Sequence, residues 1–188
     1  MRQLWAGIVI GLVLSVSPAL AGPHLDELRG HLGVGYASLR GVDEAPSGSL
    51  SVSAGLDYPI GHTLRLGTDV GYDLLGTRTV DRGSLVAELD YSVFEALALV
   101  HWFPAIPLVQ RISFGMGVFN ARADLSSSGA AAFSDLAVEQ TTRGIGFQAT
   151  LMKHKPSPVR VGVEVGWRQM YMRGDDWSLV NARLAIHY

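Results

Sequence analysis

Apolar side chains recur at every second position along most of the chain, from residue 31 to the last residue. In 159–168, for example, four valines and a tryptophan alternate with arginine, glycine and glutamate. Successive side chains of a β-strand point to opposite faces, so a period of two indicates strands with one apolar and one polar face. Eight such segments follow one another, at 31–40, 49–60, 63–76, 84–103, 109–123, 137–152, 159–172 and 177–188.

The connections between these segments alternate in character. Three are compact and contain proline, at 59–62, 104–108 and 153–158, and four are mostly polar or small, at 41–48, 76–83, 125–135 and 173–176. If the strands run up and down, all the proline turns fall at one end and all the other loops at the opposite end. Short turns at one end and longer loops at the other are typical of a transmembrane β-barrel. We therefore predict an all-β fold, an eight-stranded antiparallel up-and-down transmembrane β-barrel.

The first residues have the features of an export signal. A short positive start, Met1-Arg2-Gln3, precedes an apolar run at 4–16, and Ala19-Leu20-Ala21 is a small-x-small cleavage site. The apolar run is shorter than the ~20 residues that a spanning helix needs. We therefore expect a cleaved signal peptide at 1–21, with the barrel domain occupying 22–188.

Composition excludes several kinds of site. The formal net charge is −2, which argues against a nucleic-acid binder, and the absence of cysteine excludes disulfides, thiolate metal sites and a thiol nucleophile. The glycine pairs Gly33-x-Gly35 and Gly115-x-Gly117 do not open helices with nucleotide-loop spacing. We expect no cofactor, no metal and no nucleic-acid partner.

The polar faces of the predicted strands carry charges of both signs beside glycine and serine. Eight strands enclose an interior that side chains just fill, so these charges would lie in the lumen. Buried charges are tolerable when they are paired, which predicts a salt-bridged plug; the alternative is an ion path or a polar ligand pocket. The predicted lumen charge network is Asp57, Arg65, Asp69, Asp73, Arg111, Arg160, Glu164, Arg168 and Arg183.

Aromatic residues on the apolar faces gather at two levels. Amphipathic rings favour the headgroup depth of a membrane, so these residues predict an aromatic girdle at each interface. In 84–103 the odd positions are assigned to the lipid-facing side, which also places His101 in the interfacial belt and Glu95 near the outer headgroups. The predicted girdle residues are Tyr58, Tyr72, Tyr91, Phe103, Tyr171 and Tyr188.

Two stretches resemble a known family. Leu97–Phe103 followed by Pro104, and then Ser113–Val118 with its Gly-x-Gly-Val, are similar to the core of the outer membrane protein β-barrel domain family, which includes the OmpA/OmpX-type eight-stranded barrels. Gln110-Arg111 stands where many members have Pro-Tyr. Tyr188, preceded by alternating apolar residues, resembles the terminal signal that such barrels present to their assembly machinery.

The resemblance implies a protein of the bacterial outer membrane that contacts outer-membrane lipids and lipopolysaccharide, and we expect a monomer. The charged residues of the predicted loops are interpreted as ordinary solvated surface charge. The alternative is that arginines near the headgroups pair with lipopolysaccharide phosphates. We expect a structural or surface-interaction role with a narrow or plugged lumen, and no enzymatic activity. The alternatives are a small pore for ions or solutes and a lipid A-modifying enzyme. Against the enzyme, no histidine is followed two residues later by serine, and the four predicted loops contain no histidine.

Overall fold

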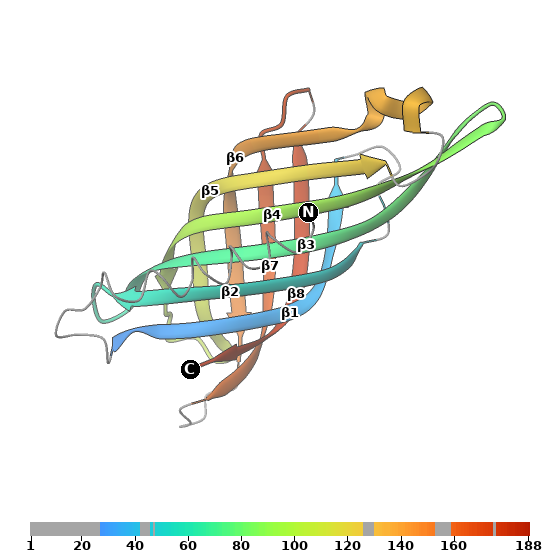
Figure 1. The fold of residues 1–188 in the computed structure, drawn as a ribbon. Helices are drawn as coiled ribbons and strands as arrows, with labels where there is room; N and C mark the ends of the chain where they lie inside the picture. Colours follow the sequence, from blue (N-terminus) through green and yellow to red (C-terminus); the bar gives the residue numbers. More distant parts are fainter. Residues whose placement is uncertain (1–26, 42–45, 47, 126–129, 153–158, 175) are drawn as a thin grey trace.

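The computed structural model describes residues 27–41, 46, 48–125, 130–152, 159–174 and 176–188 (Figure 1). The predicted signal peptide at 1–21 lies outside the described residues, and so does the turn predicted at 153–158.

Eight strands form one ring (Figure 1). They are β1 (Arg29–Arg40), β2 (Ser49–Pro59), β3 (Leu64–Arg82), β4 (Leu85–Trp102), β5 (Val109–Leu125), β6 (Val138–Leu151), β7 (Arg160–Met170) and β8 (Trp177–His187). Each strand pairs antiparallel with the next, and β1 pairs with β8, so that Val34 lies opposite Leu184 and the barrel closes. The predicted eight-stranded antiparallel up-and-down barrel is thereby confirmed.

The two ends of the barrel differ. The connections β2–β3, β4–β5 and β6–β7 lie at one end, here called the turn end, where β1 begins and β8 finishes. The opposite end, the loop end, carries the β5–β6 connection with the short 3-10 helix η2 (Ala130–Leu136). Among the described residues, no helix is long and apolar enough to cross a membrane.

The period of two sorts the side chains of β7 as the sequence predicts. Val161, Val163 and Val165 are exposed on the outer surface, whereas Glu164 is buried inside the barrel. Small residues on the inner face leave room for long polar side chains, and branched apolar residues on the outer face suit a strand.

The third strand is longer than predicted. A loop was expected at 76–83, but β3 continues to Arg82 and pairs with β4 along that length. A β-bulge between Leu74 and Gly76 leaves Leu75 without a partner of its own, and Gly76 has the positive φ of 94° that favours glycine. Gly83, with a φ of 66°, begins a two-residue hairpin connection that suits a II′ turn.

In β4 the side chains that point into the barrel are the opposite set from the predicted one. Its odd positions point inward: His101 is 0% exposed, whereas its neighbour Val100 is 44% exposed. The prediction was wrong because both faces of β4 are apolar, so that alternation alone does not choose the outer face. Glu95 therefore lies inside the barrel, not among the headgroups.

Because the odd positions of β4 point inward, apolar side chains fill the half of the lumen near the loop end. Tyr91 packs against Trp177 there, with ring centroids 6.2 Å apart. The buried apolar cluster comprises Ala37, Leu39, Leu75, Leu89, Tyr91, Val93, Leu97, Leu99, Phe119, Ala121, Ala123, Met170, Trp177 and Leu179. The charged residues therefore gather in the middle of the barrel and at the turn end.

Candidate functional site

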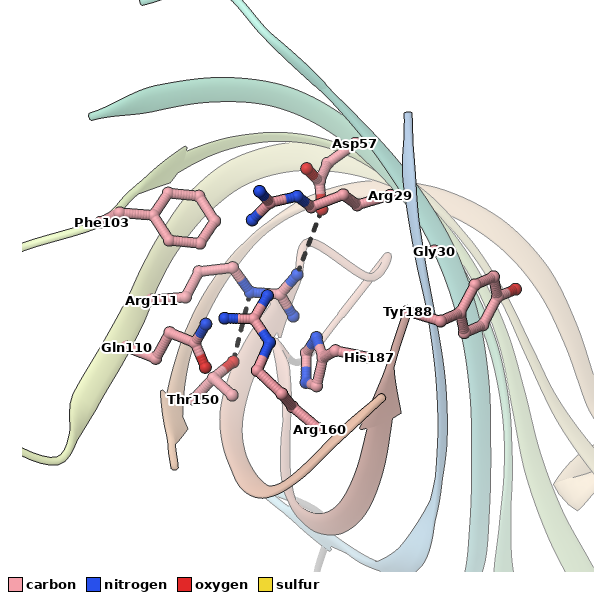
Figure 2. Close-up of a pocket in the computed structure, with 10 residues that line it drawn as sticks. All are labelled: Arg29, Gly30, Asp57, Phe103, Gln110, Arg111, Thr150, Arg160, His187 and Tyr188. Carbon is pink, nitrogen blue, oxygen red and sulfur yellow. Dashed lines mark hydrogen bonds and ion pairs between the residues drawn. The ribbon is translucent and has the colours of Figure 1, made fainter. Parts of the chain in front are cut away.

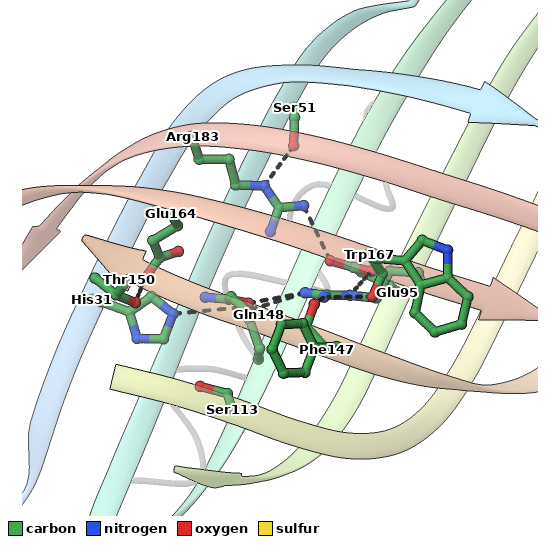
Figure 3. A network of polar contacts seen from close by, with 12 residues as sticks. His31, Ser51, Glu95, Ser113, Phe147, Gln148, Thr150, Glu164, Trp167 and Arg183 are labelled. Atoms are coloured by element: carbon green, nitrogen blue, oxygen red, sulfur yellow. Dashed lines mark hydrogen bonds and ion pairs between the residues drawn. The ribbon is translucent and has the colours of Figure 1, made fainter. Parts of the chain in front are cut away.

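A set of ion pairs crosses the middle of the lumen (Figure 3). Glu95 on β4 accepts from Arg168 Nε on β7 through Oε2 at 3.0 Å, and from Arg183 Nη2 on β8 through Oε1 at 3.1 Å. Arg183 Nη2 also lies 3.2 Å from Asp73 Oδ1 on β3. We call Glu95, Asp73, Arg168 and Arg183 the central network; it links four strands across the barrel.

Neutral groups satisfy the remaining donors of the two arginines. Arg168 Nη2 donates to Gln148 Oε1 at 3.0 Å, and its Nη1 donates to the carbonyl of Phe147 at 2.9 Å. Arg183 Nε donates to Ser51 Oγ at 2.6 Å. Both arginines are at most 1% exposed, so these bonds are needed to offset the free energy of removing the charges from water.

Glycines on neighbouring strands make room for the charged side chains. A Cβ on Gly71 would lie 2.7 Å from Glu95 Oε1, and one on Gly146 would lie 2.9 Å from Arg168 Cδ. Both distances are shorter than van der Waals contact. The glycines of the inner face are thus part of the charged site.

Histidines lie beside the central network. His101 Nδ1 is 2.7 Å from Ser113 Oγ, and His31 Nε2 is 3.7 Å from Asp69 Oδ1. The prediction of His101 in an interfacial belt was wrong, since its ring is inside. Glu95 was also absent from the predicted lumen residues. A carboxylate that faces lipid costs free energy, so Glu95 was the one sign in the sequence that the odd positions of β4 point into the barrel.

A second charged layer lies at the turn end (Figure 2). Arg65 pairs with Asp57, and its Nη2 donates to the carbonyl of Glu27. Arg111 Nη2 is 2.5 Å from Glu164 Oε1, and Arg111 Nε donates to Thr150 Oγ1 at 3.2 Å. These residues surround the mouth of the lumen.

The structure places eight of the nine predicted lumen residues in the interior, where all eight are buried. Asp69 lies between the two charged layers, 3.9 Å from Arg168 Nη2. The ninth, Arg160, is half-buried at the mouth and forms no ion pair with the described residues.

The predicted aromatic girdle divides into two groups. Tyr58, Tyr72, Tyr171 and Tyr188 are exposed on the outer surface. Tyr91 is only 7% exposed and lies inside, and the Phe103 ring lines the mouth of the lumen (Figure 2). These two assignments were wrong, for the same reason: both followed from the inverted phase of β4.

Comparisons with known proteins identify the fold. No family model matches the sequence, and no curated protein sequence matches it. Neisserial surface protein A is similar in structure, with 14% identity, a TM-score of 0.56, and coverage of 86% of this chain and 96% of that one. Ail, the attachment invasion locus protein of Yersinia pestis, is similar with 11% identity, a TM-score of 0.54, and coverage of 86% and 97%. The chain has the fold of the OmpA/OmpX-type outer-membrane barrels.

The outer surface of the barrel suits contact with lipid. Large apolar side chains are exposed around the ring, and Met116, the most exposed, shows 67% of its surface. A closed ring satisfies its backbone hydrogen bonds internally, as a bilayer requires. The fold and this surface agree with the predicted location in the bacterial outer membrane, where barrels of this kind keep their short turns in the periplasm and their longer loops outside.

A hollow of about 610 Å³ lies on the outer surface of the barrel, at the loop end of β5, β6 and β7. Thr142 Oγ1 donates to the carbonyl of Tyr171, and the Tyr171 N–H donates to the carbonyl of Arg143 at 3.1 Å. Arg143 and Arg173 line the hollow, both exposed, and neither forms an ion pair within the described part of the chain.

The β3–β4 hairpin and η2 meet at the loop end (Figure 1). Arg82 donates to both carboxylate oxygens of Asp135, at 3.0 and 2.7 Å, and its guanidinium carbon lies 5.2 Å from the Phe133 ring centroid. The hydrogen bond from Arg82 lowers the pKa of Asp135 below its usual range. These contacts join two segments of the loop end that are far apart in sequence.

Proposed function

We propose that this outer-membrane barrel has a closed lumen and serves a structural or surface-interaction role, without conducting solutes. The central network carries this proposal. Glu95, Asp73, Arg168 and Arg183 meet across the barrel and are at most 1% exposed. Side chains that reach one another from opposite walls leave no aqueous path between them, as expected for eight strands.

Conductance in a planar lipid bilayer tests this proposal. The refolded chain is expected to give no stable conductance steps. A double variant, Glu95→Ala with Arg183→Ala, removes two long side chains from the middle of the lumen and is expected to conduct if it folds. Stable steps from the unmodified chain would refute the closed lumen and support the pore.

We propose further that the chain is not an enzyme. His101 and Ser113 have the separation of a base and a nucleophile, 2.7 Å, but both are 0% exposed. No acyl chain reaches a hydroxyl enclosed in this way, and His101 Nε2 has no hydrogen-bond partner to orient the ring. Lipid A mass spectra from cells with and without the chain are expected to be identical. The proposal would be refuted if lipid A lost an acyl chain in cells with the chain and kept it in cells with Ser113→Ala.

Lipopolysaccharide is the proposed lipid partner at the external hollow. Arg143 and Arg173 offer two guanidinium groups beside Tyr171, and Arg143 lies opposite the apolar Val118 on the neighbouring strand. Guanidinium groups form bidentate hydrogen bonds with phosphate, and lipopolysaccharide carries phosphate at this level of the outer leaflet. Replacing both arginines with glutamine is expected to weaken the retention of lipopolysaccharide by the purified barrel, whereas Arg40→Gln, at another exposed position, is the control.

Tyr188 is the proposed contact with the assembly machinery. Its N–H and carbonyl pair with Gly30 at 3.0 Å each, so the terminal residue belongs to the seam that closes the barrel, while its side chain is exposed. Tyr188→Ala is expected to slow insertion in cells but not spontaneous folding in detergent. The closed seam also favours a monomer, because it leaves no strand edge for a second copy to pair with; light scattering of the purified barrel tests this.

A further inference from the structure

Three arginines converge at the periplasmic mouth of the lumen (Figure 2). Arg29, Arg111 and Arg160 line a cavity of about 10 Å³ together with Thr150 and Gln110. A volume of that size accommodates one water-sized group. Arg111 and Thr150 are buried, whereas Arg160 is half-buried and Arg29 is exposed, so the cavity opens toward the periplasm.

The positive charge at this mouth is only partly compensated. The carboxylate of Asp57 is paired with Arg65, and that of Glu164 is paired with Arg111. Within the described residues, Arg29 and Arg160 form no ion pair. The layer therefore holds four arginines, Arg29, Arg65, Arg111 and Arg160, against the two buried carboxylates, Asp57 and Glu164.

The middle of the lumen has the opposite balance. Asp69, Asp73 and Glu95 supply three carboxylates there, against the two guanidinium groups of Arg168 and Arg183. An anion is therefore attracted to the mouth and repelled further in. This arrangement suits a binding site at the mouth and not a path for anions through the barrel.

The donors that remain at the mouth suit a phosphate oxygen. Arg111 uses Nη2 for Glu164 and Nε for Thr150, and its Nη1 makes only a 3.9 Å contact with Asp57. Arg160 presents its guanidinium group at the rim, where it forms no ion pair with a carboxylate of the described residues. Guanidinium groups bind phosphate through paired N–H donors, and charge-assisted bonds of this kind are the strong ones.

We propose that the periplasmic mouth is a phosphate-binding site, in which one oxygen enters the cavity over Arg111 while Arg160 and Arg29 bind the oxygens outside. The proposal goes beyond the structural role, since a closed barrel needs no ligand at this end. The same chemistry has two sources, free phosphate in the periplasm and the headgroup of a phospholipid in the inner leaflet. Tyr188, whose side chain is exposed on the outer surface, also lines this cavity.

Titrations of the barrel folded in maltoside micelles, in a buffer without phosphate, test the site. The signals of the arginine Nε–H groups are followed by NMR, with inorganic phosphate in one arm and short-chain phosphatidylglycerol in the other, and chloride holds the ionic strength constant. A saturable shift of the Arg160 signal is expected in at least one arm. Saturation by phosphate identifies the free ion, and saturation by the lipid alone identifies the headgroup.

Arg160→Gln is the decisive variant, because Arg160 holds no ion pair in the described structure and its loss strands no carboxylate. It is expected to weaken binding about tenfold or more, the effect of losing a charge-assisted bond, as followed at the Arg111 signal. Arg40→Gln at the external end is the matched control and is expected to bind as the parent does. Absence of saturation in both arms, or equal weakening by Arg160→Gln and Arg40→Gln, would overturn the proposal.

Discussion

Glu95 and Arg183 meet across the full width of the barrel. Glu95 belongs to β4 and Arg183 to β8, four strands away in either direction around the ring, yet Oε1 and Nη2 are 3.1 Å apart. Arg168 binds the other oxygen of the same carboxylate. One carboxylate therefore holds two arginines from the opposite wall, and it is the residue on which the closed lumen most depends.

Replacing Glu95 with glutamine is expected to destabilise the barrel by about 3 kcal/mol or more, because it removes the carboxylate that both buried guanidinium groups share. Among the described carboxylates, Arg183 then keeps only Asp73, and Arg168 keeps only the 3.9 Å contact with Asp69. Urea unfolding in lipid vesicles measures the change. Glu139→Gln is the control, since Glu139 pairs with Arg122 at an exposed position and such pairs contribute about 1 kcal/mol or less. Equal midpoints for the two variants would contradict a dry, paired network.

Gly71→Ala tests the fit between the glycines and the network. The added methyl group would lie 2.7 Å from Glu95 Oε1, and displacing that carboxylate is expected to cost about 1–3 kcal/mol. Gly61→Ala is the matched control, because nothing lies within 4 Å of its Cβ position. If both variants unfold at the same urea concentration, the inner face has more free space than the structure describes.

Val163→Arg tests the outward direction of β7. Val163 is 44% exposed on the outer surface, and an arginine on the lipid face of a β-barrel costs about 2–4 kcal/mol at the bilayer midplane and less toward the interfaces. The folded fraction, read from heat-modifiable gel mobility, is expected to fall, whereas Val163→Leu is expected to fold as the parent does. A normal folded fraction for the arginine variant would mean that this face does not contact lipid.

Asp135 reports the external contact between the β3–β4 hairpin and η2. Because the hydrogen bond from Arg82 lowers its pKa, the contact is complete above the usual aspartate pKa and is lost as the pH falls through the lowered value. An NMR titration of the Asp135 carboxyl is expected to show a midpoint below the usual range, which returns to that range in Arg82→Gln. An unchanged midpoint would show that the two segments do not meet in solution.

The sequence predicts most of the fold because the two faces of most strands differ chemically. In β7, glycine and charge alternate with valine, so only one side of the strand suits lipid. The face of β4 was not predictable from alternation, since Phe94, Ala96 and Val100 are as apolar as Val93, Leu97 and Leu99. Its phase is fixed by pairing with β3 and β5, and pairing partners are a tertiary property.

The charged residues of the lumen were predictable on the same strands as the fold, those whose two faces differ chemically. Arg111, Glu164 and Arg168 were placed in the lumen because they interrupt otherwise apolar or small-residue strands. Glu95, the carboxylate that joins Arg168 to Arg183, was not predicted, because the inward face of β4 was assigned wrongly. Which charge meets which depends on the register and shear of eight strands, and that information is not local.

A double-mutant cycle between Glu95 and Arg183, with Glu95→Gln and Arg183→Gln alone and together, measures the central claim most directly. In a closed, dry lumen, the free energies of unfolding are expected to be non-additive by about 1–3 kcal/mol, the range for residues in one buried network. Additive effects would mean that water separates and screens the two charges, and would contradict a lumen closed by this ion pair.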